Sequence, residues 1–244
     1  ATIDLIEKYF GTWKSKEVSP FIQPDKTSVE APITKETFGP QQEMVYMGYK
    51  FDGAGSQQAM MTQMVDMILA NSQAGLIDID LLLKQKVLSA GSFPQILKDY
   101  TVHFLYGVPK EGQSLENVKD LLLEEIEKIK AGDFEDWLVE AVINDIKLNR
   151  VKSLESNRGR AFLMLEAFIN ELAYEEVVFD LDTMTKITKA DIIAFVNEHY
   201  NDNYVVSYKR IGASDRHSVP KPKITSVEVD RDSQSEFYAG FDTV

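Results

Sequence analysis

The alternation of side chains along the sequence predicts the strands of this chain. In residues 43–51 one alternating set, from Val45 to Phe51, is apolar, as expected of a strand with one buried face. Weaker alternation predicts further strands at 28–37, twice within 87–107, and at 204–210. We expect the two strands within 87–107 to join near residues 92–95, because Pro94 removes a backbone donor from the ladder.

Apolar residues three and four positions apart predict the helices. These cover about 2–10, 57–70, 76–86, 114–132, a segment after 133, 156–173, and a segment after 188. Ser114 is a candidate N-cap, Gly132 a C-terminal stop, and Asp133 a cap for the helix that follows. Thr188 with Asp191 resembles a capping box. Strands and helices in this order favour an α+β fold, with an antiparallel or mixed sheet covered by helices.

Four methionines share the predicted helix 57–70, at positions 60, 61, 64 and 67. Such a helix can form an adaptable binding groove. A face packed into the core is the expected alternative, because the methionines follow helical spacing. The preceding Gly53-Ala-Gly-Ser56 could hold an anion at the helix N-terminus, but a tight strand-to-helix turn with Ser56 as cap is the simpler interpretation.

Composition limits the partners of this chain. Its 244 residues carry a net charge of −13, which makes nucleic acid and anionic membranes poor partners. The acidity could attract basic peptides, although it is more often a feature of solubility. No apolar run of about 18 residues predicts a membrane span, and no signal peptide opens the sequence. The absence of cysteine excludes disulfides and thiolate metal sites, and suits the cytoplasm and the bacterial periplasm equally.

The histidines predict no metal site. His103, His199 and His217 are far apart, and none has a second histidine at the spacing of a zinc-binding helix. His103, within a strand pattern, is expected to be a half-buried ring with its polar atoms satisfied. His199, near a helix C-terminus, is expected to interact with the helix dipole, and His217 falls in the tail.

Two groups of carboxylates, Glu124-Glu125 with Glu127 and Glu175-Glu176, lie on predicted amphipathic helices. We expect them on solvated outer faces, since an acid/base pair requires a pocket that separates two pKa values.

The arginines Arg150, Arg158 and Arg160 could together hold a carboxylate, but pairing within the chain is the expected reading. No nucleophile motif appears. The residues therefore predict no catalytic, cofactor-binding or metal-binding side chain.

Several segments nevertheless carry a resemblance to a known family, beginning with Thr2–Gly11 with Trp13 and with Gln41–Tyr49. The first resembles the closing helix of the catalytic domain in the insulinase/pitrilysin zinc metallopeptidases. The second resembles the opening of that family's next, inactive domain. Central and late helices of that domain are similar to segments 111–116, 130–134 and 188–192, and its last strand to 200–209.

This resemblance implies four regions. They are a closing helix of an upstream catalytic domain at 1–13, a linker at 14–27, a non-catalytic domain at 28–212, and a connector toward a further domain at 213–244. The connector contains Pro220 and Pro222 and no amphipathic helix.

The resemblance also implies a function outside this chain's own residues. Zinc is expected in the upstream catalytic domain and none in this segment, which would not be an enzyme alone. The implied partners are other domains of the same polypeptide and a peptide substrate, which the domain would help to enclose in a chamber. The family's supporting arginine and tyrosine do not carry over, because 88–107 lacks arginine, so Tyr100 and Tyr106 receive no role. The alternative is a subunit of a proteolytically inactive homologue that acts in binding or assembly.

Overall fold

A five-stranded mixed sheet forms the centre of the fold. The computed structural model describes residues 2–19, 28–213, 220–223, 225, 230 and 233–240, and all statements below concern these residues. The strand order is β1 (Ile33–Gly39), β5 (Tyr204–Ile211), β2 (Met44–Asp52), β4 (Tyr100–Val108), β3 (Ser89–Ile96). β1 runs parallel to β5, and every other neighbouring pair is antiparallel. The predicted α+β class with a mixed sheet is therefore confirmed.

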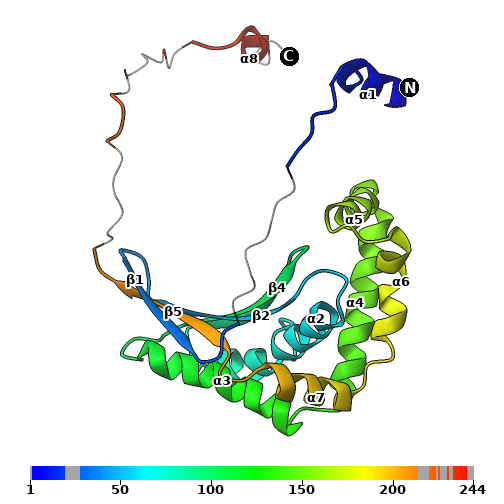
Figure 1. Cartoon of the computed structure of the whole chain (residues 1–244). Coiled ribbons are helices and arrows are strands. Elements are labelled where there is room, and N and C mark those ends of the chain that lie inside the picture. The colour runs from blue at the N-terminus through cyan, green and yellow to red at the C-terminus, as the bar shows by residue number, and fades with distance from the viewer. Residues whose placement is uncertain are drawn as a thin grey trace.

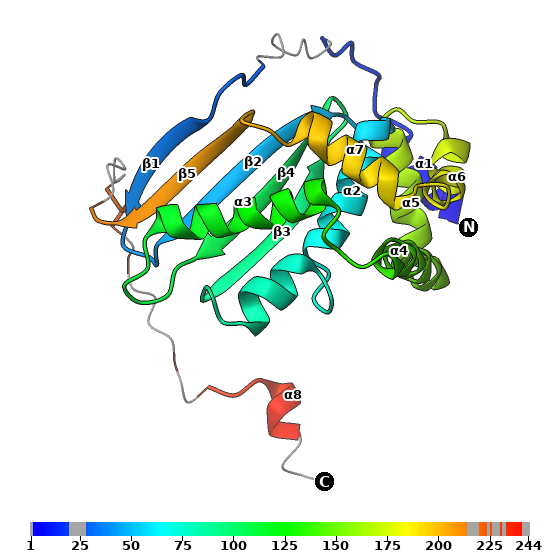
Figure 2. The ribbon, with the colours of Figure 1, turned by 90° about the horizontal axis from the view of Figure 1, so that it is seen from below.

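Helices cover one face of this sheet. Three of them, α2 (Gln57–Leu69), α3 (Leu115–Ala131) and α7 (Lys189–His199), lie on the same side, and Figure 1 shows no described helix against the opposite side. In Figure 2, viewed from the helical side, α3 crosses in front of the central strands. The buried set of β2, from Val45 to Phe51, packs against these helices, as the alternation predicts. Met61 and Met64 are buried in the same core, so the core interpretation of the methionine helix is confirmed.

The remaining helices lie beside or away from this layer. They are η1 (Asp78–Leu83, a π-helix), α4 (Trp137–Glu155), α5 (Asn157–Ile169), α6 (Tyr174–Met184), α1 (Thr2–Phe10) and α8 (Glu236–Ala239). α4 packs on α2, and α5 packs on α4 and α6. A second, small apolar cluster of Leu163, Ala167 and Val177 joins α5 to α6. α1 has no buried residue.

The structure confirms the two strands predicted within 87–107, but the turn that joins them lies later in the sequence than predicted. Pro94 lies inside β3, and the chain reverses after Ile96, where the Leu97 amide donates to the Tyr100 carbonyl at 3.0 Å. β3 pairs on one side only, because it is an edge strand of the sheet. An edge strand tolerates a residue without an N–H group, so proline does not end it.

Helix boundaries are confirmed where the cap is a local motif. Ser114 caps α3, Gly132 ends it, and Thr188 forms a capping box with Asp191 at the start of α7. Asp133 was predicted to cap the next helix, and this is wrong because α4 begins only at Trp137. The ammonium of Lys189 on α7 binds the Phe134 carbonyl and Asp136, and so holds the intervening segment out of the helix.

Other boundaries moved as well. The first strand begins at Ile33 rather than 28. The predicted helix 76–86 is helical only over 76–83, most of which is η1. The predicted helix 156–173 ends at Ile169, where the chain turns into α6. The predicted connector contains the one-turn helix α8, whose N-cap is Ser235.

Candidate functional site

The histidines lie in separate surroundings. Among the described residues, no group of three or more histidine, aspartate or glutamate side chains is arranged to hold a metal ion. His199 lies at the end of α7, 3.9 Å from Glu198, with its ring against Phe195. His217 lies outside the described residues.

His103 is fully buried rather than half-buried, and both of its ring nitrogens have partners. Nε2 lies 3.1 Å from Asp66 Oδ1, and Nδ1 lies 2.7 Å from the Tyr200 hydroxyl. A carboxylate can only accept, so Nε2 carries the proton and Nδ1 accepts from Tyr200. Burial raises the pKa of Tyr200 well above its ordinary value, which keeps the hydroxyl a donor. Ser92 also donates to Asp66, at 2.6 Å, so the network is internally satisfied and joins the sheet to α2 and α7.

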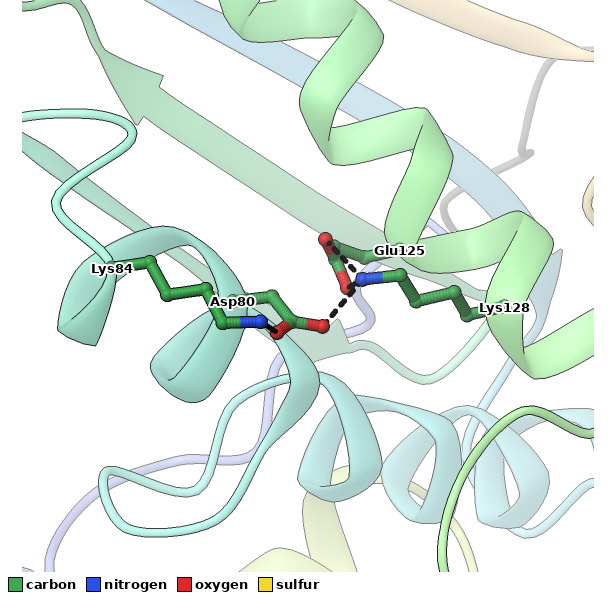
Figure 3. Close-up of polar contacts among 4 residues, drawn as sticks. All are labelled: Asp80, Lys84, Glu125 and Lys128. Carbon is green, nitrogen blue, oxygen red and sulfur yellow. Dashed lines mark hydrogen bonds and ion pairs between the residues drawn. The ribbon is translucent and has the colours of Figure 1, made fainter.

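One predicted solvated carboxylate is buried instead. Glu125 of α3 has no exposed surface, which contradicts the expectation of an outer face. Figure 3 shows its carboxylate against the ammonium of Lys128, at 2.8 Å, and Lys128 also binds Asp80 of η1. Lys84 pairs with the other oxygen of Asp80.

The two carboxylates of this ionic cluster have opposite pKa shifts. Burial raises the pKa of Glu125, and its bond to Lys128 only partly offsets that effect. For Asp80 burial also acts to raise the pKa, but hydrogen bonds from Lys128 and Lys84 outweigh it and lower the pKa. Each of the four side chains pairs with an oppositely charged member of the cluster. The cluster is therefore a structural link between η1 and α3. Glu175 and Glu176 are exposed, as predicted.

The arginines do not converge. Arg150 donates to the Val177 carbonyl and to Asp180, both at 2.9 Å, whereas Arg158 lies over the Phe162 ring. Pairing within the chain is therefore confirmed for Arg150. A hollow of about 630 Å³ lies between α2 and the α5–α6 pair, and this Arg150–Asp180 pair forms part of its wall. The residues Gly53 to Ser56 form the expected turn, with the Ser56 side chain capping α2.

The open face of the sheet is the most distinctive surface. Successive side chains of a strand alternate between the two faces, and the register places Tyr46 beside Tyr106, and Phe104 beside Phe93, on the side opposite the helices. The Tyr46 and Tyr106 rings are 5.9 Å apart, and the Phe93 and Phe104 rings stack at 5.2 Å. We call these four rings the aromatic cluster.

A glycine makes room for the aromatic cluster. Gly91 is the partner of Tyr106 in the register, and a Cβ there would lie 2.9 Å from the Tyr106 hydroxyl oxygen. The ring therefore lies across the strand rather than standing above it. Tyr46 is still 37% exposed and Phe93 42% exposed. Exposed rings held against one another give a surface that can accept an apolar side chain without reorganisation.

Sequence reasoning missed this surface, although its residues were in view. The alternation in 43–51 places Tyr46 in the set of side chains that faces away from the core. An aromatic residue in that set was the signal in the sequence that could have indicated the surface. The contribution of Phe93 was obscured because its segment was predicted to be a turn.

Comparison with known proteins identifies the family. The chain belongs to the peptidase M16 inactive domain family, whose model matches residues 1–146. Comparison with the curated proteins finds no match.

Solved structures share the fold at low sequence identity. A protease from Helicobacter pylori superposes with a TM-score of 0.77 at 16% identity, over 85% of this chain and 51% of that one. The peptidase M16 inactive domain from Pseudomonas fluorescens gives 0.67 at 11% identity, over 84% and 49%. A chain of complex III2 from Candida albicans gives 0.65 at 11% identity, over 85% and 51%. This chain thus spans about half the length of these three chains, and at such identities the likeness establishes the fold. Among the described residues, no helix is both long and apolar enough to span a bilayer.

Proposed function

We propose that this chain is a non-catalytic wall domain of a larger zinc metalloendopeptidase of the insulinase/pitrilysin kind. In this proposal residues 28–212 form the wall domain, and 1–13 and 213–244 lead to neighbouring domains. Zinc and the reacting groups would belong to another domain, and this chain would help to enclose the peptide. Membership of an inactive-domain family supports the non-catalytic part.

One observation carries the proposal: the described helices cover a single face of the sheet. An open sheet face in water normally carries polar side chains. Here it carries the aromatic cluster, whose Tyr46 and Phe93 remain exposed. The surface is suited to contact with extended peptide, because stacked rings supply apolar area at little cost in side-chain entropy.

Photo-crosslinking tests where peptide binds. The full chain is incubated with an unstructured peptide that carries a benzophenone side chain, and the crosslinked sites are mapped by mass spectrometry. We expect crosslinks on β2, β3 and β4, and their loss in the variant Tyr46→Ala/Phe93→Ala. The matched control is Phe168→Ala, which removes an 80% exposed ring from α5 and is expected to leave the crosslinks unchanged. Crosslinks confined to the helical face would contradict the proposal.

Metal content and cleavage test the non-catalytic part. Elemental analysis of the purified chain is expected to find no stoichiometric zinc, and incubation with peptides is expected to give no products. One tightly bound zinc per chain would overturn this part of the proposal.

A second candidate is a binding or assembly subunit without proteolytic function. This candidate is supported by the occurrence of the same fold in a chain of complex III2. The two candidates differ in the polypeptide to which the domain belongs. A His-x-x-Glu-His motif in a preceding domain would support the peptidase, and its absence there would support the assembly subunit.

A further inference from the structure

The open sheet face differs in charge from the molecule as a whole. The chain carries a net charge of −13, yet the strands turn three lysines and one acid to this face. Lys50 and Asp52 belong to the Tyr46 set of β2, and the register places Lys35 and Lys209 on the same side through their strand partners. A cationic sheet face on an acidic chain indicates an acidic partner.

The three lysines differ in how firmly they are held. The Lys209 ammonium donates to the carbonyls of Gln41 and Gln42, and so closes the turn between β1 and β2. The Lys50 ammonium lies 5.7 Å from the centre of the Tyr100 ring. In the part of the chain that the structure describes, the side chain of Lys35 is exposed and has neither a hydrogen bond nor an ion pair. Among the described residues of this face, Lys50 and Lys35 are therefore the cations available to a ligand.

These two lysines lie at a peptide-like spacing from Tyr46, but in different directions: Lys50 along β2, and Lys35 across the sheet toward β1. Lys50 is four residues from Tyr46 on the same strand, or about 13 Å along it. Lys35 pairs with Ser207, which pairs with Tyr46, so it lies two strands or about 10 Å away. An extended peptide advances about 3.3 Å per residue, so about three or four residues separate a ring bound at the cluster from a carboxylate at either lysine.

We propose that the open face selects extended peptide segments that combine an apolar or aromatic side chain with carboxylates about three or four residues away. The ring of the peptide would pack on the aromatic cluster. A carboxylate of the peptide would pair with Lys50 where the peptide runs along β2, or with Lys35 where it runs across the strands toward β1. This inference rests on the proposed function, because it names the class of peptide that the wall domain would contact.

A pair of charge-swapped peptides tests the selection. Both are extended, end-blocked peptides of about ten residues with Phe-Leu at the centre, and they carry either Glu or Lys three residues to each side. Fluorescence polarisation with the full chain measures each affinity. We expect the Glu peptide to bind roughly threefold to tenfold more tightly, since each exposed ion pair contributes about 0.2–1 kcal/mol. The preference should decrease in concentrated salt.

Charge-reversal variants locate the selection. Lys50→Glu and Lys35→Glu should each reduce the preference, and together they should reverse it. Lys152→Glu changes an exposed lysine of α4 by the same charge and should leave the preference unchanged, which controls for net charge.

The remaining outcomes separate this inference from the proposed function. If both peptides bind with equal affinity and Tyr46→Ala weakens both, the proposed charge selection is wrong. The wall-domain proposal is not contradicted by that outcome. Binding that is insensitive to Tyr46→Ala and Phe93→Ala, or absent, would overturn both. A dimer in sedimentation that Tyr46→Glu dissociates would make a second copy the occupant of this face, and would also overturn both.

Discussion

At the scale of single residues, Glu125 shows how a charge can belong to the core. Its carboxylate is fully buried, and Lys128, whose side chain is 28% exposed, supplies the opposite charge. Removing one partner of a buried pair leaves an uncompensated charge, whereas replacing both with apolar residues of similar size is often neutral. The stability of this region should therefore depend on the match between the two residues more than on either alone.

The variant Lys128→Met should accordingly lose more stability than the double variant Glu125→Met/Lys128→Met. We expect the single variant to lose on the order of 3 kcal/mol of unfolding free energy, and the double variant clearly less. Urea denaturation monitored by circular dichroism measures both. Lys98→Met is the control, because it breaks an exposed pair with Glu171 and should change stability by about 0.5 kcal/mol or less. A double variant less stable than the single one would contradict this account.

The stability lost in Lys128→Met should depend on pH, and the direction of that dependence can be worked out. Burial raises the pKa of Glu125 in the folded state, so the folded chain protonates this carboxyl more readily than the unfolded chain does. Between the two pKa values the unfolding free energy then falls as pH rises. Without the cation of Lys128, the raised pKa of Glu125 should rise further. The deficit of Lys128→Met should therefore shrink as the pH is lowered from about 8 to about 5.

A further prediction at the scale of single residues concerns the hydroxyl of Tyr200. Its hydroxyl donates to His103 Nδ1 in the interior, so Tyr200→Phe leaves a buried acceptor without a partner. We expect a loss of about 1–2 kcal/mol in urea denaturation. Tyr174→Phe, at a 40% exposed position on α6, should have no measurable effect. An unchanged stability of Tyr200→Phe would show that this hydrogen bond contributes little.

At the scale of elements, the sequence predicted helix boundaries best where the boundary is set by residues close in sequence. The N-caps Ser114 and Thr188 and the stop at Gly132 act within one turn of their own helix, and all three are confirmed. The errors at Pro94 and Asp133 have a different origin. Whether proline ends a strand depends on whether that strand is at the edge of the sheet, and the start of α4 depends on contacts from Lys189 in a distant helix. Neither fact is contained in a short window of sequence.

Gly132 allows the local and the tertiary contribution to be measured separately. Its φ of +72° favours glycine, and a Cβ there would also lie 2.9 Å from Ile193 Cδ1. Gly112 has a similar φ of +77°, but nothing lies within 4 Å of its Cβ position. We expect Gly112→Ala to cost about 1 kcal/mol through backbone strain alone, and Gly132→Ala to cost about 1 kcal/mol more through crowding of α7. Equal losses in urea denaturation would show that Ile193 moves aside freely.

At the scale of the whole molecule, the candidate surface is a product of topology. Tyr46, Phe93, Phe104 and Tyr106 come from three strands, and only the register of β2, β4 and β3 brings them together. Alternation could place each residue on a face, yet it could not say which face the helices leave open. Finding the candidate surface therefore required the assembled sheet.

Two apolar clusters of unequal size occur among the described residues, and this predicts unequal local stability. The main cluster joins the sheet to α2, α3 and α7, whereas α5 and α6 share only the small cluster of Leu163, Ala167 and Val177. Large side chains of this pair, among them Phe168 at 80% and Phe179 at 59%, remain exposed. Regions with little buried apolar contact open at lower free energy than the core.

Hydrogen exchange of the full chain, read by mass spectrometry, should therefore resolve two units. We expect peptides from 157–184 to exchange at least about tenfold faster than peptides from α3 after correction for intrinsic rates, a difference of about 1.4 kcal/mol or more in opening free energy. Arg150→Met removes the bonds from α4 to Val177 and Asp180, so it should accelerate exchange in α6 and leave α3 unchanged. Arg158→Met is the matched control, because this arginine contacts only the Phe162 ring of its own helix among the contacts described. If 157–184 and α3 instead exchange together at the free energy of global unfolding, the small cluster is as strongly coupled as the core, and the division into two units is wrong.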